Sequence, residues 1–390
     1  MRNFHWIQVD SEMTTEFDII ETPARLEKLV DHLRRQQAIA VDLEADSMYH
    51  FQEKVCLIQT ATAHRKAVID PLHIHDLSAL GSVFADPNIK KIFHGADYDV
   101  RSLYRDFKFE VKDLFDTQVA CKFLGVKATG LESVLMDHFG IQLDKKYQRK
   151  DWSIRPLPAA MLAYAADDVS YLLPLAQRLE ESLRIKGRRR WVREECDLLS
   201  LVRPVRNDHE PLFMHFKGAG RLRPRNLAAL EALLRYRRNL AEVKDRPLFK
   251  IFSNKSLLQL AIEKPADLKQ LAESEVLSHK QLKMYGDELV EAIQHALKIP
   301  AAKLPSYPRQ KAPRMNPDVP LRMKALKKWR DKKAKTLELD PGVLLNKSVM
   351  TVLVSEKPTE PKSLDVIADL KEWQKRELGP EILKVLNHVK

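Results

Sequence analysis

Cysteine is scarce in this sequence, and the three that occur, Cys56, Cys121 and Cys196, are scattered along the chain. None lies in a C-x-x-C pair, so neither a disulfide framework nor a zinc site is indicated, and a reducing compartment is expected. Long apolar runs are also missing. No stretch approaches the roughly 20 residues that a membrane helix needs, and the first residues lack the apolar core of a signal peptide. We therefore expect a cytoplasmic protein with no membrane segment.

Glycine is rare too, with 11 residues in 390. No G-x-x-x-x-G-K-[ST] phosphate-binding loop occurs, and the nearest match, at residues 342–348, lacks the second glycine, which disfavours a nucleotide-driven motor. Positive charge is what the sequence has in excess: 66 Lys and Arg against 54 Asp and Glu leave a net charge of +12. This excess indicates a polyanionic partner, although solubility alone can also account for it.

The length of the chain exceeds what one hydrophobic core supports, so two or three domains are expected. In the first of these, residues 1–200, Thr22-Pro23 opens a helix, because a capping residue precedes proline at the first helical position. Strands are predicted at 38–45, 54–62, 66–72 and 90–96, and helices at 77–84 and 97–107. Three hairpin-like strands followed by alternating helices and strands predict an α/β domain on a mixed sheet.

The rest of the chain, from about residue 215, is predicted to be entirely helical and to contain an internal sequence repeat. Residues 215–298 form one predicted helical domain, and 321–390 form a second, more diverged copy. Between them, residues 299–320 are a proline-rich linker of extended, semi-rigid type. Three short matches recur in the same order at offsets of 92 or 93 residues, which indicates two copies of one module. They pair 254–256 with 346–348, 263–265 with 356–358, and 235–241 with 328–334.

Three acidic motifs carry the chemistry in the α/β half. Asp42 and Glu44 alternate with apolar residues in a predicted strand, so their side chains share one face. Asp99 follows the strand predicted at 90–96. Tyr164 and Asp168 have the i, i+4 spacing of neighbours on a helix, with Leu172 and Leu175 predicted to extend the same face.

Four carboxylates without His or Cys ligands are typical of a site for hard divalent cations, Mg²⁺ or Mn²⁺. Two such ions about 4 Å apart hold both the attacking water and the leaving oxygen during displacement at phosphorus. A tyrosine one helical turn from a ligand is placed to orient the attacking water. Each motif alone also fits an ordinary surface strand, helix cap or half-buried aromatic, but the three together are hard to reconcile with chance.

The motifs at 41–47, 93–99, 115–120 and 164–174, with 150–157, resemble the ribonuclease D family. These are 3′→5′ exoribonucleases of the DEDD class in its tyrosine-bearing variant, with a ribonuclease H-like (DnaQ-like) exonuclease fold. The resemblance implies two metal ions held by Asp42, Glu44, Asp99 and Asp168, with Tyr164 orienting the water. The two helical copies resemble HRDC domains, which follow the nuclease in this family.

The resemblance implies release of 5′-mononucleotides from RNA with a single-stranded 3′ end, with precursor tRNA as the substrate. A DNA exonuclease of the same chemistry remains an alternative, because the four acids do not read the 2′-hydroxyl. A non-catalytic nucleic-acid-binding HRDC protein is a second alternative, disfavoured because all four acids and the tyrosine are present.

Other residues allow two interpretations. Trp152 and Arg155 either stack on a base and grip a phosphate, or fill the core and the surface. His94 either packs or hydrogen-bonds near the strand end, or it has a direct catalytic role. Asp116 and Thr117 are interpreted as structural or supporting residues.

The basic runs 187–191 and 221–225 either guide RNA or are solvated faces. Asp46, the third acid of the stretch at 40–48, matches no ligand position, so we expect it to lie toward solvent and Asp46→Ala to be nearly silent.

Overall fold

The computed structural model of the protein describes residues 16–204, 210–308 and 318–389. The chain divides into two compact units, each described here by itself. The first unit comprises Met1–Ala45, Val55–Pro204 and Arg314–Lys390, and the second comprises Asp46–Lys54 and Val205–Pro313. Each unit contains one of the two helical copies. Among the described residues, no helix is long and apolar enough to cross a membrane.

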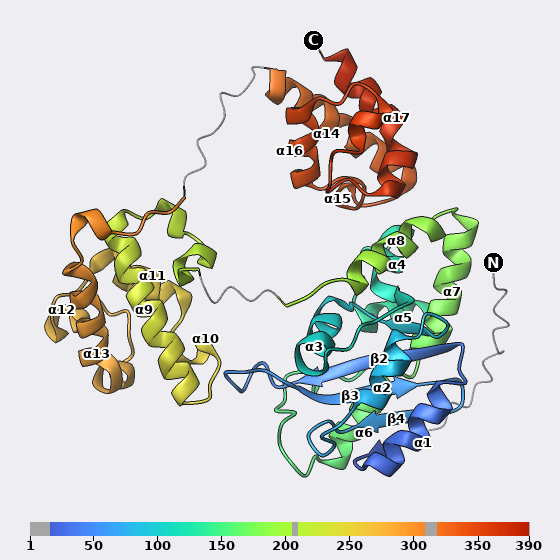
Figure 1. Ribbon diagram of the computed structural model, residues 1–390, viewed down its shortest axis with the longest axis horizontal. Helices are drawn as coiled ribbons and strands as arrows, with labels where there is room; N and C mark the ends of the chain where they lie inside the picture. Colours follow the sequence, from blue (N-terminus) through green and yellow to red (C-terminus); the bar gives the residue numbers. More distant parts are fainter. Residues whose placement is uncertain (1–15, 205–209, 309–317, 390) are drawn as a thin grey trace. The chain divides into compact units, whose positions relative to one another are not determined.

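A six-stranded mixed sheet forms the centre of the first unit (Figure 1). Its spatial order is β1-β4-β3-β2-β5-β6, in which β2, β3 and β4 pair antiparallel and the other neighbours pair parallel. The predicted three-strand succession is therefore confirmed, while the two short edge strands β1 and β6 were not predicted. The strands are β1 (Asp18–Ile20), β2 (Ala38–Ala45), β3 (Val55–Ala61), β4 (Lys66–Ile69), β5 (Lys90–Phe93) and β6 (Leu114–Asp116).

In the described residues 16–204 of this unit, eight helices lie between or after the strands. The first begins as predicted, because the Thr22 side chain accepts from the Arg25 backbone N–H and Pro23 occupies the first helical position. The helices are α1 (Pro23–Leu33), α2 (Ser78–Ala85), α3 (Asp97–Phe107), α4 (Thr117–Leu124), α5 (Leu131–Phe139), α6 (Ala159–Asp168), α7 (Leu172–Ile185) and α8 (Arg189–Ser200).

One prediction about the third motif is wrong. Tyr164 and Asp168 do share helix α6, but that helix ends at Asp168, so Leu172 and Leu175 belong to α7 and not to the same face. The Ser170 hydroxyl donates back to the Ala166 carbonyl at 3.0 Å. Such a side-chain bond competes with continued helix and favours a break.

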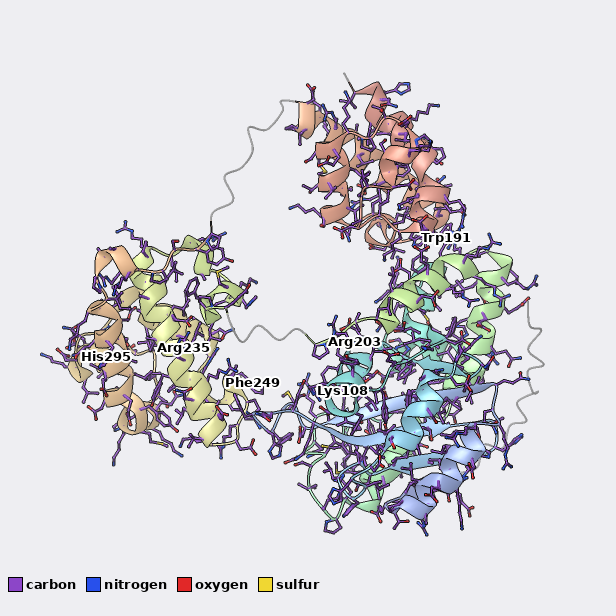
Figure 2. All side chains as sticks on the ribbon, viewed as in Figure 1. Lys108, Trp191, Arg203, Arg235, Phe249 and His295 are labelled. Carbon is purple, nitrogen blue, oxygen red and sulfur yellow. The ribbon has the colours of Figure 1, made fainter. Side chains whose placement is uncertain are left out.

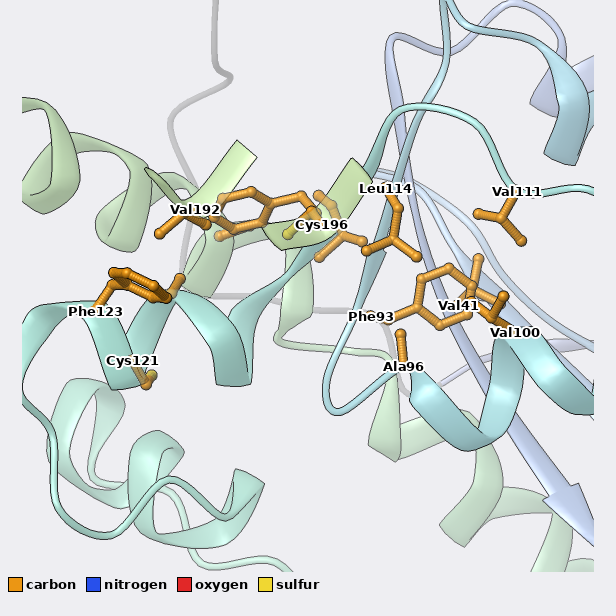
Figure 3. Close-up of a cluster of buried hydrophobic side chains, with 14 of the residues drawn as sticks. Val41, Phe93, Ala96, Val100, Val111, Leu114, Cys121, Phe123, Val192 and Cys196 are labelled. Atoms are coloured by element: carbon orange, nitrogen blue, oxygen red, sulfur yellow. The ribbon is translucent and has the colours of Figure 1, made fainter. Parts of the chain in front are cut away.

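Alternation along β2 separates the core from the acids. Val41 and Leu43 are buried, whereas Asp42 and Glu44 on the other face are only partly covered. Figure 3 shows Val41 in a cluster with Phe93 of β5 and Val100 of α3, which joins the sheet to the helix that follows it. The rigid core therefore reaches the strand that carries the first two acids.

Both helical copies share one architecture. In the first copy α9 (Pro224–Val243), α10 (Leu248–Ile251), α11 (Asn254–Glu263), α12 (Leu268–Glu273) and α13 (His279–Leu297) follow one another. In the second copy α14 (Asp318–Leu337), α15 (Pro341–Leu344), α16 (Lys347–Glu356) and α17 (Glu372–His388) do so. Short 3₁₀ turns add Leu212–His215, Ala219–Arg221, Ala301–Lys303 and Pro361–Leu364. Helix α14 begins within the predicted linker, of which residues 309–317 lie outside the described part.

The recurring tripeptides have a structural cause. Lys264 and Lys357 each end a ten-residue helix in the left-handed conformation and are followed by proline, which cannot continue the helix. The Nη1 atoms of Arg237 and Arg330 donate at 3.0 Å to the carbonyls of Phe252 and Leu345, 15 residues further on in each copy. The repeat predicted from sequence is therefore confirmed in three dimensions.

The second copy packs against α8 of the first unit. Trp191, labelled in Figure 2, stacks on Trp373 with ring centroids 4.8 Å apart. The Glu194 carboxylate accepts from the backbone N–H groups of Glu372 and Trp373 at 2.7 and 2.8 Å, at the N-terminus of α17. One buried cluster spans both parts, so the second copy shares the core of the sheet domain.

The basic runs are partly structural. Arg188 is buried and donates to the carbonyls of Phe123 and Leu337 at 2.8 and 2.6 Å. Arg225 donates to the Leu297 carbonyl at the end of α13 at 3.1 Å. Both guanidinium groups donate to helix-end carbonyls, so these two residues have structural roles. RNA guidance by the other residues of the two runs stays a prediction.

The expectation for Asp46 is wrong. Its side chain is 0% exposed, and Oδ1 accepts from the Lys54 backbone N–H at 2.8 Å. A β-bulge at Glu44/Ala45 disturbs the alternation just before it.

Candidate active site

Three of the predicted acids meet at one place. Asp42 and Glu44 project from the same face of β2, and Asp168 is the last residue of α6. Ligand oxygens of these three side chains lie within 4.8 Å of one another. Such spacing lets a single cation contact all three carboxylates.

Asp99 approaches from a third element. It lies in the first turn of α3 and is 7% exposed. Burial raises its pKa, and the charge of Asp42 raises it further. The close group of three does not include Asp99. The charge interactions of Asp99 with Asp42 and Glu44 indicate that its carboxylate borders the cluster.

The electrostatics of the site are those of uncompensated negative charge. Burial raises the pKa of Asp42 to about 7 and, with repulsion from Asp42, that of Asp168 to about 8. Burial and the charges of the other three acids raise the pKa of Glu44 as well. Within the described residues, no Lys or Arg forms an ion pair with any of the four.

Tyr164 stands one helical turn before Asp168. Burial and the neighbouring carboxylates raise its pKa, so the hydroxyl keeps its proton at neutral pH. Its ring packs against Trp152 and Tyr147, with centroids 6.1 and 5.8 Å away. The tyrosine is thus a fixed hydrogen-bonding group beside the acids.

Asp116 supports the turn that leads to Asp99. Its Oδ1 accepts from the Gly95 N–H at 3.0 Å, and its Oδ2 accepts from the Ala96 N–H at 2.8 Å. The same carboxylate caps α4 through Gln118 and Val119. A single buried side chain therefore joins the start of α4 to the residue that precedes α3.

His94 is held in the same network. Its Nδ1 lies 2.9 Å from Thr117 Oγ1, which donates to the Phe93 carbonyl at 2.9 Å. Burial lowers the pKa of His94, so the neutral ring is favoured. These contacts support packing of His94 near the strand end.

The structure gives Trp152 and Arg155 partners inside the protein. Trp152 is 1% exposed and lies in the small cluster beneath α6. Arg155 donates two hydrogen bonds to the Asp70 carboxylate, from Nε to Oδ2 at 2.6 Å and from Nη2 to Oδ1 at 2.8 Å. It also donates to the carbonyls of Trp152 and Cys56. These contacts favour supporting roles, and substrate contact by either residue stays a prediction.

Asp70 belongs to a second acidic cluster that the sequence analysis did not single out. Ligand atoms of Glu21, Asp70 and His73 lie within 4.8 Å of one another. Burial alone would raise the pKa of Asp70, but hydrogen bonds from Arg155 and His73 outweigh it and lower the value. The Arg155 guanidinium already supplies the positive charge here. Asp70 directly follows β4, but nothing in the sequence pairs it with Arg155.

The first cluster fits a divalent cation. Its donors are all carboxylate oxygens, which Mg²⁺ and Mn²⁺ prefer, and its raised pKa values are those of acids lacking positive charge. Asp42, Glu44 and Asp168 would hold the ion, with Asp99 at the border. Acids on β2, α3 and α6 of a mixed sheet fit the class of 3′-5′ exonucleases that the sequence motifs resemble.

Comparisons with known proteins support the assignment to this class of exonucleases. The model of the family described as 3'-5' exonuclease matches residues 17–184, and that of the HRDC domain matches 226–293 and 321–386. Ribonuclease D of Gluconacetobacter diazotrophicus is 32% identical over 317 residues, covering 79% of each chain. Because this similarity spans most of both chains, the protein belongs to the ribonuclease D family of 3′-5′ exoribonucleases.

Two further relatives are informative. The crystal structure of Escherichia coli ribonuclease D superimposes with a TM-score of 0.74 at 26% identity, covering 95% of this chain and 99% of that one. Mouse exosome complex component 10 is 33% identical over 263 residues, which are 63% of this chain but 30% of that protein. The predicted fold, an exonuclease domain followed by two HRDC domains, is confirmed.

Proposed function

We propose that the protein removes nucleotides one at a time from RNA 3′ ends and releases 5′-mononucleotides. The observation that carries this proposal is the convergence of Asp42, Glu44 and Asp168 within 4.8 Å, bordered by Asp99. Two Mg²⁺ or Mn²⁺ ions are the cofactors that these carboxylates suit. When bound, the ions would neutralise the phosphate and make a water molecule more acidic.

The four acids and Tyr164 have different proposed roles in the reaction. The four acids would hold the cations beside the terminal phosphodiester. Because the acids come from β2, α3 and α6, they would also fix the orientation of that phosphodiester. Tyr164, protonated at neutral pH, orients the attacking water by a hydrogen bond. Attack at phosphorus breaks the bond to the 3′ oxygen, leaving a nucleoside 5′-monophosphate and a shortened RNA.

Structured RNA with a single-stranded 3′ tail is the proposed substrate, and precursor tRNA is the proposed natural example. The E. coli relative is described as an exoribonuclease involved in structured RNA processing. The net charge of +12 favours a polyanion. A cytoplasmic location is also proposed, in keeping with the scarcity of cysteine, since only three cysteines are scattered along the chain.

The test uses purified full-length protein, Mg²⁺ or Mn²⁺, and 5′-labelled RNA or DNA strands with free or blocked 3′ ends. A ladder from unblocked RNA supports the proposal. A ladder from DNA but not RNA favours the DNA exonuclease, and no digestion with retained binding favours the non-catalytic HRDC protein.

Neighbouring acids of α6 supply a matched pair of variants. Asp168→Asn removes a proposed ligand, whereas Asp167→Asn changes an exposed side chain that pairs with Lys66 at 3.5 Å. The first should abolish digestion while the fold is retained, and the second should leave it nearly unchanged. Equal activity in both variants would remove the metal-site assignment.

A further inference from the structure

Gln59 of β3 is an unexplained polar group in the core of the first unit. Its side chain is 0% exposed, and neither Nε2 nor Oε1 has a hydrogen-bond partner among the described residues. Leaving a buried amide unpaired costs about 1–3 kcal/mol, so an apolar residue of similar shape would stabilise the fold better. A polar residue at such a position indicates a partner that the folded chain alone does not supply.

The register places this amide beside the acid cluster. Gln59 lies directly opposite Asp42 in the antiparallel pair β2/β3, and Leu57 lies opposite Glu44. Directly opposed residues project from the same face with Cβ atoms about 5 Å apart. Gln59 is therefore the nearest cross-strand neighbour of Asp42 on the face that carries the acids.

Helix α6 covers the same patch. Gln59 also pairs with Val68 of β4, and Val68 and Leu57 share a buried cluster with Ala165 and Ala166 of α6. The amide thus lies between Asp42 and the helix that carries Asp168. The amide is not exposed to solvent, and Asp42 is the polar side chain that the register places next to it.

We propose that Gln59 is a positioning residue for the metal site. Its Nε2 donates a hydrogen bond to the Asp42 carboxylate when that group binds a cation, which fixes the oxygen that faces the ion. Ligating carboxylates are commonly oriented in this way by a neighbouring donor. A neutral amide can do so without adding positive charge, whereas a guanidinium, as Arg155 does for Asp70, would compete with the cation. This inference rests on the proposed function.

The test compares two isosteric changes on one strand. Gln59→Met removes the amide, and Thr60→Val removes a hydroxyl that is equally buried and unpartnered but faces the other side of the sheet, opposite Val41. Mn²⁺ binding is measured by calorimetry without RNA, alongside thermal unfolding in EDTA and the kcat and KM for RNA. Gln59→Leu replaces Gln59→Met if the latter fails to fold.

We expect Gln59→Met to weaken Mn²⁺ binding about 10- to 100-fold and to lower kcat, with KM for RNA unchanged and an equal or higher unfolding midpoint. Thr60→Val should raise the midpoint and leave metal binding alone. If Gln59→Met binds Mn²⁺ as tightly as Thr60→Val, the positioning role is overturned. If the wild type itself neither binds Mn²⁺ nor digests RNA, the proposed function has failed instead.

Discussion

Two acidic clusters of the first unit use the same residue type under opposite electrostatic conditions. In the first, burial and mutual repulsion raise the pKa of Asp42 to about 7 and that of Asp168 to about 8. In the second, Asp70 is 3% exposed, yet hydrogen bonds from Arg155 and His73 lower its pKa despite its burial. The difference lies in the guanidinium, which only the second cluster contains.

The contrast distinguishes an acid whose charge is compensated within the folded chain from an acid whose charge requires an external cation. The folded chain already stabilises the Asp70 carboxylate, so a cation there would have to displace Arg155. The carboxylates of Asp42, Glu44 and Asp168 repel one another, and an external divalent cation is what relieves the repulsion. Changing Asp to Asn should therefore have opposite consequences in the two places.

Asp42→Asn has the largest expected effect, on catalysis. Removing a ligand of the metal site should lower the rate of RNA hydrolysis at least about 1,000-fold, since several kcal/mol of transition-state stabilisation depend on the bound ions. Stability in EDTA should stay equal or rise, because one of the repelling carboxylates is gone. Single-turnover digestion and thermal unfolding measure the two effects. Full activity of this variant would remove Asp42 from the site.

Asp70→Asn should act on stability instead. Breaking a buried ion pair from one side leaves the Arg155 guanidinium uncompensated, so the free energy of unfolding should fall by about 3 kcal/mol. Urea unfolding measures this, with the exposed neighbour Glu21→Gln as the control that should change it by less than about 0.5 kcal/mol. A stable Asp70→Asn protein that no longer binds Mn²⁺ would reverse the roles of the two clusters.

Local periodicity in the sequence predicts which side chains of the acid cluster are neighbours within one strand or one helix. Alternation in β2 places Asp42 and Glu44 on one face, and the i, i+4 spacing places Tyr164 beside Asp168. What joins β2 to α6 is tertiary, and there the resemblance to a known family supplied the connection. Asp70 and Arg155 are 85 residues apart, and no local pattern indicates their pairing.

Predictions from sequence fail where the fold supplies a partner that no local pattern indicates. Asp46 is expected toward solvent because it matches no ligand position, whereas the folded chain buries it against the Lys54 N–H. Gln59 is a similar case, because a glutamine within an apolar strand indicates no function until the strand register places it opposite Asp42.

The two clusters should also respond to pH in opposite directions. Acids with raised pKa values bind more protons in the folded state, so the stability of the metal-free protein should fall by several kcal/mol as pH rises from about 5 to 8. The lowered pKa of Asp70 stabilises the fold above its ordinary value of 3.8 and loses that effect as pH falls below it. Thermal unfolding in EDTA measures the first slope between about pH 5 and 8 and the second slope below pH 3.8.

Two changes identify the source of the neutral-pH slope. Saturating Mg²⁺ should flatten it, since a bound cation keeps the carboxylates ionised at pH 5 and at pH 8 alike. Asp168→Asn in EDTA should reduce it, because one of the groups that titrates near neutrality is removed. A slope that neither change alters would originate outside the acid site.

The smallest expected effect concerns Asp46, a buried acid whose partners are a backbone N–H and the Lys54 ammonium, 3.8 Å away. It lies two residues beyond Glu44 but resembles Asp70, because the folded chain compensates its charge. Asp46→Ala should lower the free energy of unfolding by about 1–2 kcal/mol through loss of the hydrogen bond to the Lys54 N–H, with Mn²⁺ affinity unchanged. Asp31→Ala, at an exposed acid 3.8 Å from Arg34, is the surface control. Weaker Mn²⁺ binding by Asp46→Ala would show that proximity to the site, rather than compensation by the fold, decides which acids serve the metal.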